Sequence, residues 1–326
     1  MLLDITLLAV GLVLILAGAN YMTDGAAALA KRMGMSDFMV GLTVVSMMTS
    51  APELMVSITS AINASTSMAI GNIVGSNIFN ILIIIGICAM IRPIKVTDGI
   101  MVNEIPLVIL SSVVLLTMGS APILDGAPMT LTRVDGILLL LFFIIFMRYT
   151  IGAAKKARKD DPTTEEGEKK KTMPLWKALA ALLGGLAGLI FGGDWFVDGA
   201  SGLAKAIGWS ESLIGLTILA AGTSLPELAT SAVAAARGFS GICLGNVIGS
   251  NIFNIFFVLG CTSTIMPLQF GNINSLDLLV LTGASVLFWA TGWFFGHRTI
   301  KRSEGAVMVA LYIAYIAYLI AQSGAV

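Results

Sequence analysis

A motif of twelve residues occurs twice in this chain. Residues 71–82 read GNIVGSNIFNIL and residues 245–256 read GNVIGSNIFNIF, which are identical at nine of twelve positions. A longer motif precedes each copy: residues 41–54 read GLTVVSMMTSAPEL and residues 215–228 read GLTILAAGTSLPEL, identical at eight of fourteen. Both pairs align without a gap at one offset, 174 residues. The chain therefore consists of two copies of one unit.

The composition of both copies is that of a membrane protein. Of the 326 residues, 57% are hydrophobic and only 12% are charged, and the mean hydropathy is +0.93. A soluble chain of this length needs more charge to cover its surface. Apolar runs recur throughout, and a helix of roughly 20 residues spans the hydrocarbon core. We expect an all-α membrane protein with ten transmembrane helices, arranged as two inverted five-helix repeats.

One stretch interrupts the apolar pattern. Residues 155–171 read KKARKDDPTTEEGEKKK, a mixed-charge segment that cannot lie in lipid. Its interleaved acids argue against nucleic-acid binding. We therefore predict three regions: residues 1–150 form the first five-helix repeat, residues 151–173 a charged cytoplasmic linker, and residues 174–326 the second repeat. An odd number of spans in each repeat inverts the second copy, as in alternating-access transporters.

The distribution of basic residues predicts the orientation. If the N-terminus lies outside, 17 of the 19 Lys and Arg fall at or near cytoplasmic ends of helices, as the positive-inside rule requires. We expect a multi-pass protein of the plasma membrane, the bacterial or archaeal inner membrane, with both termini outside. Cys88, Cys243 and Cys261 have apolar neighbours and no CxxC spacing, so they are expected to be packing residues. His297 is expected to be solvated in a charged loop.

The longer motif places a proline and a glutamate inside an apolar segment. Pro52 and Pro226 each remove a backbone hydrogen bond and free carbonyl oxygens near residues 46–49 and 220–223. Such backbone is tolerated at membrane depth only where it is buried or lines an aqueous cavity. Glu53 and Glu227 follow, and a carboxylate there is costly unless it is paired or binds a cation. The alternative is a proline kink whose glutamate bonds to a neighbouring helix.

The shorter motif places polar residues on one helical face. They recur every four residues as Asn72, Ser76 and Asn80, and in the second copy as Asn246, Ser250 and Asn254. The neighbouring Asn77 and Asn251 lie on a flank of that face, from which they could bond between helices. The stripe is either a structural polar seam or part of a ligand set. Carboxylate, hydroxyl, amide and carbonyl oxygens suit Ca²⁺ and Na⁺, whereas thiolates and imidazoles suit softer metals.

These residues predict a cation exchanger. Two glutamates balance one divalent ion or share several monovalent ions, so competition for them would couple the two ion types. The sequence contains no GxxxxGK[ST] nucleotide-binding loop, which favours secondary over ATP-driven transport. The alternatives are an exchanger of other specificity, H⁺/Ca²⁺ or Mg²⁺, and a non-coupled cation-binding channel or sensor. An enzyme is disfavoured because the glutamates lack a nucleophile–base constellation with a third orienting group.

At these motifs the sequence resembles the calcium/cation antiporter superfamily, specifically the prokaryotic sodium/calcium exchangers. The paired TSxPE and GNxxGSNxxN motifs, the ten spans and the central linker carry the resemblance over nearly the whole chain. Proton-coupled calcium exchangers of this superfamily usually carry a glutamate where Gly75 and Gly249 stand. The resemblance therefore favours the sodium-coupled branch.

The resemblance also implies a role for each matching residue. Glu53 and Glu227 would be the main calcium ligands and would also serve sodium. Thr49 and Thr223 would contribute carbonyls to calcium, and the carbonyls of Ser46 and Ala220 would help to bind sodium. The remaining ligands would be Ser50, Ser76, Ser224 and Ser250 at sodium sites, with Asn80 and Asn254 lining the centre. The family also implies that the first and sixth helices slide near Gly18 and Gly192, and that three Na⁺ exchange for one Ca²⁺.

Two residues depart from the family pattern. The family usually has glycine before Thr-Ser in both motifs, but the first copy has Met48 where the second has Gly222. Methionine adds bulk and restricts the backbone where the helix should unwind, which could weaken one sodium site or alter selectivity. Some relatives carry an aspartate where Asn254 stands, so its absence argues against a potassium-dependent variety.

We predict an antiporter that exchanges Na⁺ for Ca²⁺ by alternating access, with the ions competing for paired midplane glutamates. The protein is not expected to be an enzyme or to need a cofactor. Its expected partners are Ca²⁺ and Na⁺ as substrates and the lipid bilayer, with no nucleic acid, and it is expected to function as a monomer. The linker is too short to hold a folded regulatory domain.

Overall fold

The helices that the structure describes account for nearly all of the predicted spans. The computed structural model describes residues 1–120, 126, 128–160, 173–208, 218, 220–271, 273–295 and 298–323. Within these residues, nine helices are long and apolar enough to cross a membrane. The tenth predicted span, the second of the second repeat, is described at residue 218 and from Ala220 onward. The all-α, ten-helix fold class is confirmed.

The first repeat begins with a long straight helix and continues with helices that are interrupted by wider π-helical turns. Its elements are α1 (Leu2–Met33), α2 (Asp37–Val40), η1 (Gly41–Val45), α3 (Ser46–Thr49), α4 (Ala51–Ile62), α5 (Thr66–Phe79), η2 (Asn80–Ile84), α6 (Ile85–Ile91), β1 (Ile94–Lys95), η3 (Ile100–Glu104), α7 (Ile105–Gly119), β2 (Thr130–Leu131) and α9 (Arg133–Asp160).

The described part of the second repeat has a similar sequence of elements. They are α10 (Leu175–Ala206), α12 (Ala220–Gly222), α13 (Leu225–Ala236), α14 (Ser240–Ile252), η6 (Phe253–Leu259), α15 (Gly260–Ile265), β3 (Leu268–Gln269), α16 (Ser275–Ala290), η7 (Thr291–Phe295), β4 (Thr299–Ile300) and α17 (Arg302–Ser323). One difference is that the π-helical turn η7 follows α16, whereas η3 precedes α7. Helix α9 reaches Asp160, ten residues past the expected end of the first repeat. The rest of the expected linker, residues 161–172, and the predicted loop residue His297 lie outside the described residues.

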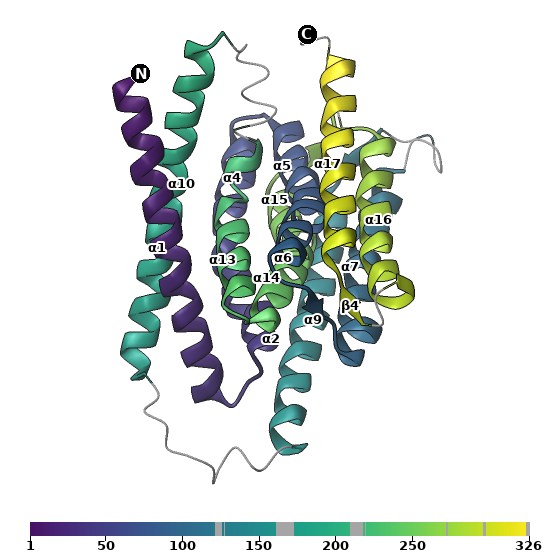
Figure 1. Cartoon of the computed structure of the whole chain (residues 1–326). Coiled ribbons are helices and arrows are strands. Elements are labelled where there is room, and N and C mark those ends of the chain that lie inside the picture. Colours follow the sequence, from purple (N-terminus) through teal and green to yellow (C-terminus); the bar gives the residue numbers. More distant parts are fainter. Residues whose placement is uncertain are drawn as a thin grey trace.

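The two repeats run in opposite directions. In Figure 1, α1 descends from the N-terminus at the upper end of the molecule, whereas its counterpart α10 ascends from the lower end. Both ends of the chain lie at the upper end, and α9 ends at the lower one. This is the arrangement that five spans per repeat produce. The inversion predicted from the duplication is therefore confirmed.

Two short β-ladders join the repeats to each other. Strand β1 pairs with β4 in antiparallel register, Ile94 opposite Ile300, and β2 pairs with β3, Leu131 opposite Leu268. At the offset of 174 residues, β1 corresponds to β3. Each ladder therefore joins a connecting segment of one repeat to one of the other, and the two ladders are related by the same pseudo-twofold symmetry as the helices.

Helices α1 and α10 pack against each other over their whole length at one side of the molecule (Figure 1). Glycines make this contact close: a Cβ on Gly18 would lie 2.7 Å from the carbonyl oxygen of Gly185. Gly11 and Gly25, one heptad before and after Gly18, meet α10 backbone in the same way. Small residues that let helix backbones approach are the usual means of helix association in lipid.

The centre of the molecule is formed by the two shorter motifs. Helices α5 and α14, with the turns η2 and η6 that follow them, lie between the α1–α10 pair and the outer helices α7, α16 and α17 (Figure 1). In α14 every residue from Ile242 to Ile252 is buried. The polar stripe of each motif therefore lies inside protein and not against lipid, which is where intramembrane polar side chains are tolerated.

Candidate cation site

The two proline–glutamate motifs meet at the centre of the molecule. Pro52 and Pro226 lie in the first turns of α4 and α13, where a proline costs little because the first N–H groups of a helix have no intrahelical acceptor. Each proline ends the preceding short helix, so the backbone breaks at Ser50 (φ −83°, ψ 8°) and Ser224 (φ −91°, ψ 4°). The breaks place both glutamates in the core, 1% and 0% exposed.

Each glutamate is held by the motif of the other repeat. Ser50 Oγ donates to Glu227 Oε1 at 3.1 Å, and Ser224 Oγ donates to Glu53 Oε1 at 3.3 Å. The two carboxylates are close enough for their charges to repel each other. The second oxygen of each, Oε2, is buried and has no hydrogen-bond partner among the described residues. Two facing carboxylates with one unpartnered oxygen each are an arrangement that a cation would stabilise.

An asparagine of the shorter motif holds each side of the site in place. Thr49 Oγ1 donates to Asn246 Oδ1 at 3.0 Å, and Asn246 Nδ2 bonds to the Glu227 backbone carbonyl at 3.4 Å and to Ser231 Oγ at 3.0 Å. The other copy repeats the pattern with Thr223 Oγ1 and Asn72 Oδ1 at 3.2 Å. The oxygen of each asparagine thus accepts a threonine hydroxyl of the other repeat. Both residues position the site.

Sequence reasoning missed two members of this frame, Ser57 and Ser231. Each accepts the Nδ2 group of the asparagine in its own repeat, at 3.3 Å for Ser57 and 3.0 Å for Ser231. The signal was present, because the 174-residue offset aligns one serine with the other. It was overlooked because both serines lie one turn beyond the motif, and a single serine in a helix does not by itself indicate a site.

The remaining stripe residues turn unpartnered oxygens toward the centre. Four side chains are at most 1% exposed, and each has an oxygen without a hydrogen bond of acceptable geometry to any described residue: Ser76, Ser250, Asn80 and Asn254. Ser76 nevertheless lies beside the Glu53 carboxylate. A buried polar group without a partner costs about 1–3 kcal/mol. Together with the two carboxylate oxygens, these groups form a buried set of six ligand atoms with no protein partner.

Of the two flanking amides that the sequence suggested as bonds between helices, only Asn77 makes one, because Asn251 Nδ2 donates to the Val247 carbonyl of its own helix at 2.8 Å. Asn77 Nδ2 donates to the Asn251 backbone carbonyl at 3.2 Å, and Asn254 Nδ2 donates to Asn77 Oδ1 at 3.0 Å. The Asn77 side chain therefore links helices of the two repeats, whereas the side-chain oxygen of Asn254 has no hydrogen-bond partner. The π-helical turns η2 and η6 begin at Asn80 and Phe253. Such turns are frequent at functional sites, because they re-aim side chains within a helix.

The carbonyls predicted as ligands are only partly free. The carbonyl of Ser46 accepts the Ser50 N–H at 3.0 Å and the Thr49 hydroxyl at 3.4 Å. A carbonyl oxygen has two lone pairs, so these bonds occupy the Ser46 oxygen that the resemblance assigned to sodium. At the equivalent place in the second copy, Ala220 begins the short helix α12. Of the twelve predicted residues, the structure brings together the six with unpartnered oxygens and the serines and threonines that hold them.

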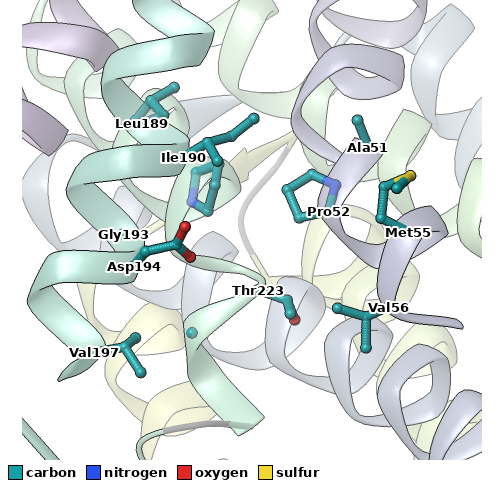
Figure 2. A pocket seen from close by; sticks show the side chains of 12 residues that line it. Ala51, Pro52, Met55, Val56, Leu189, Ile190, Gly193, Asp194, Val197 and Thr223 are labelled. Atoms are coloured by element: carbon teal, nitrogen blue, oxygen red, sulfur yellow. The ribbon is translucent and has the colours of Figure 1, made fainter. Parts of the chain in front are cut away.

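A pocket lies next to the site. It has a volume of about 410 Å³ and is lined by residues of α4, α10, α12 and α13. Figure 2 shows Asp194 of α10 on one wall, and Ala51 and Pro52 of α4 facing it. Pro52, Thr223 and Pro226 also line it, and they are site residues or their direct neighbours. On the other side of the core, α1 packs against α13.

The cysteines take no part in the site. Cys88 and Cys243 are buried, Cys261 is half-buried, and all three are free thiols, in agreement with a packing role. Among the residues that the structure describes, no group of three or more His, Cys, Asp or Glu side chains gathers as a soft-metal site would need. The candidate ligand atoms of the central site are all oxygens.

Two inverted repeats that bury facing carboxylates and unpartnered oxygens at their junction define a membrane carrier for cations. The comparisons with known proteins agree. The model of the sodium/calcium exchanger protein family matches residues 3–152 and 177–321. The chain belongs to the sodium/calcium exchanger family, and is accordingly a cation antiporter of the membrane and not an enzyme.

Individual relatives cover the chain almost completely. It is 31% identical to the sodium/calcium exchanger MaX1 of Methanosarcina acetivorans, over 96% of this chain and 97% of that protein. It is 34% identical to the inner membrane protein YrbG of Escherichia coli K12, over 98% and 97%. A solved structure of the sodium-calcium exchanger NCX_Mj, soaked with Na⁺ and Sr²⁺, superimposes with a TM-score of 0.81 at 33% identity, over 97% and 98% of the two chains.

Proposed function

We propose that the protein exchanges Na⁺ for Ca²⁺ by alternating access, and that both ions compete for Glu53 and Glu227. One observation carries the proposal: equivalent positions of the two repeats, Glu53 and Glu227, Ser76 and Ser250, and Asn80 and Asn254, each contribute one buried oxygen without a partner. Such a set satisfies a hard cation, which prefers oxygen ligands. The names of MaX1 and NCX_Mj, both sodium/calcium exchangers, support the ion pair.

The ligands that we assign are the two glutamates and the residues around them. Glu53 Oε2 and Glu227 Oε2 would bind Ca²⁺ or share Na⁺, with the hydroxyls of Ser76 and Ser250 and the amide oxygens of Asn80 and Asn254. Ser50 and Ser224, which donate to the carboxylates, would also serve Na⁺, and Thr49 and Thr223 would contribute their backbone carbonyls. The backbone carbonyls of Ser46 and Ala220 complete the assignment, and the Ser46 carbonyl would have to release one of the two bonds that it accepts.

Competition for these atoms provides the coupling. Two neighbouring carboxylates out of water are costly as long as both are charged and no cation lies between them. The site therefore exchanges one bound ion for another more easily than it stands empty. Movement of an empty site is disfavoured, which is the requirement for an antiporter as opposed to a leak.

We place the protein in the inner membrane as a monomer with both termini outside. The name of YrbG supports the membrane, and the bias of Lys and Arg supports the orientation. The repeats are assigned to residues 1–150 and 174–326, joined by the charged segment 151–173 on the cytoplasmic side. In this orientation, the pocket would open toward the outside, because Asp194 lies nearer to the outer end of α10, at Ala206, than to its start at Leu175.

The experiment is Ca²⁺ uptake into sodium-loaded proteoliposomes, with and without an outward Na⁺ gradient. Wild type is expected to take up Ca²⁺ only with the gradient, and Glu53→Gln plus Glu227→Gln to reduce uptake at least about a hundred-fold. Glu304→Gln is the matched control, because that carboxylate only caps the start of α17 by accepting the Lys301 N–H at 2.8 Å. Uptake that ignores Na⁺ and follows a pH gradient would make the protein a proton-coupled exchanger. Uptake without any counter-ion would make it a channel.

A further inference from the structure

The pocket between α4 and α10 contains one charged group. Of the described residues that line it, Asp194 alone carries a charge, and the others are apolar apart from Thr223. Figure 2 shows its carboxylate pointing from α10 into the pocket, toward the wall formed by Ala51 and Pro52. It makes no hydrogen bond or ion pair with any residue in the described part of the chain.

Asp194 also lies at membrane depth. It precedes the end of α10 at Ala206 by about 18 Å of helix, within a stretch long and apolar enough to span the bilayer. An acid in such a position is costly unless it faces a protein interior or a water-filled cavity, and by default it marks an ion pathway. The pocket supplies the cavity. The charge and the cavity are two separate observations at one place.

The other repeat lacks this charge. At the offset of 174 residues, Asp194 corresponds to Asn20 of α1. The Asn20 side chain donates to the Leu16 carbonyl at 2.9 Å, within its own helix. When alternating access opens the opposite passage, α1 would form its wall as α10 forms the wall of this one. That wall would present an amide where this one presents a carboxylate.

We propose that Asp194 is a cation recruitment residue that acts in one passage only. Cations arriving from the side of the chain termini meet its carboxylate in the pocket before they reach Glu53 and Glu227. The inference rests on the proposed function in requiring cation transport, but it does not depend on which cations are exchanged. Its role is to hold and concentrate the ion, and the central ligands then replace it.

The physical basis is the focusing of charge in an apolar cleft. A charge between low-dielectric walls raises the local concentration of counter-ions and their rate of arrival. For a single carboxylate we expect a gain of roughly three- to ten-fold for a divalent ion. Coulomb energy is proportional to the charge of the ion, so the divalent effect is the square of the monovalent one. A nine-fold effect on Ca²⁺ would accompany about a three-fold effect on Na⁺.

The test is to measure the apparent KM for Ca²⁺ and for Na⁺ from each side of the membrane. The proteoliposomes are first separated into those with the C-terminus outside and those with the C-terminus inside. Asp194→Asn is expected to raise the Ca²⁺ KM roughly three- to ten-fold from the side of the termini, with kcat within two-fold. The Na⁺ KM should rise by about the square root of that factor, and both values should stay unchanged from the other side. Asp194→Glu should behave as wild type.

Two further variants make the result decisive. Glu304→Gln removes an acid at the start of α17, which does not line the pocket, and it is expected to leave KM unchanged. Asn20→Asp places a carboxylate in the opposite passage and should lower the Ca²⁺ KM from that side. An unchanged KM in Asp194→Asn, or an equal rise from both sides, would overturn the proposal. If wild type exchanges other cations than Na⁺ and Ca²⁺, the same comparison with those cations still decides the role of Asp194.

Discussion

Asn246 is the residue whose side chain connects most of the site. It accepts from Thr49 of the first repeat and donates to the Glu227 carbonyl and to Ser231 of the second. Its twin Asn72 does the same in reverse. The glutamates are therefore held through a chain of bonds in which each repeat depends on the other. A substitution of one asparagine should therefore alter the position of both carboxylates.

Asn246→Ala is expected to weaken both stability and ion binding. It leaves the buried Ser231 hydroxyl without its hydrogen bond, at about 1–3 kcal/mol, and it lets Glu227 move. The melting temperature in detergent should fall by several degrees and the Ca²⁺ KM should rise. Asn63→Ala, at the exposed end of α4, is the control and should change neither. A drop in kcat at normal KM would show that Asn246 acts on the conformational step instead.

Met48 is the residue at which the first of the longer motifs departs from the family pattern. It lies in α3 and packs against the hydrophobic core, whereas its counterpart Gly222 lines the pocket. A Cβ on Gly222 would lie 2.9 Å from a Val197 methyl group. We call the side of the molecule with the pocket the open side, and the opposite side, where α1 packs against α13, the closed side. The methionine fills space on the closed side, whereas the glycine lines the pocket on the open side.

Met48→Gly is expected to destabilise the protein without removing transport. Glycine within a helix costs about 1 kcal/mol, and losing the partly buried side chain costs roughly as much again. The free energy of unfolding should fall by about 2 kcal/mol in denaturant titration, while sodium-dependent Ca²⁺ uptake persists. Uptake that instead changes its ion selectivity would show that the side chain shapes the site, as the departure from the family pattern suggested.

At the scale of elements, the α1–α10 pair is a contact between backbones. Gly18 and Gly185 face each other so closely that a side chain on either would meet main-chain atoms, which cannot turn aside. The two helices therefore have one allowed separation, although a smooth surface of small residues still permits movement along their length.

Gly185→Val should force the pair apart. The added Cβ would lie 2.7 Å from the Gly18 carbonyl oxygen and the Met22 nitrogen, and overpacking of this kind typically costs about 1–3 kcal/mol. Lower thermal stability and slower exchange are expected. The neighbouring Gly184→Val is a closely matched control, since a Cβ there meets no described atom within 4 Å. Equal loss in both variants would mean that valine disturbs the helix itself and not the contact.

An ion pair fastens α1 to the core on the closed side only. Arg237, at the end of α13, pairs with Asp24 of α1 and also donates to the Asn20 carbonyl. The equivalent positions on the open side are Asn63 and Asp198, which have no complementary charge. The pair therefore favours the conformation in which α1 rests against α13.

Asp24→Asn should shift the equilibrium toward the opposite conformation. The pair is partly exposed, so we expect about 0.2–1 kcal/mol, up to roughly five-fold in population. A cysteine placed at Ala229, the counterpart of Met55 in the pocket, reports the population of the opposite conformation. A thiol reagent added on the closed side should label this cysteine up to about five-fold faster in Asp24→Asn than in the protein with Asp24. High salt should produce a similar increase in wild type. No increase in either case would assign the closure to packing alone.

At the scale of the whole molecule, the duplication made the fold predictable. Gapless alignment at one offset, five spans per copy and the charge bias were sufficient for the inverted repeats, and the polar stripe identified Ser76, Asn80 and their twins. The β-ladders were not predictable, because pairings of two residues between distant loops leave no periodic signal. The asymmetry of the passages was not predictable from the motifs either. It depends on a small free-energy difference between two packings of the same helices, to which single residues such as Asp24 and Asp194 contribute.

The length of the α1–α10 pair has a consequence for the lipid. Each helix has 32 residues, about 48 Å at 1.5 Å per residue, against roughly 30 Å of hydrocarbon. The pair lies at the edge of the molecule (Figure 1), and its outer face carries exposed Leu12, Val13 and Leu183. It must therefore tilt, project or thicken the membrane around it. Any movement of the pair changes that mismatch and therefore its free-energy cost. The turnover rate of the protein should accordingly depend on the acyl-chain length of the surrounding lipid.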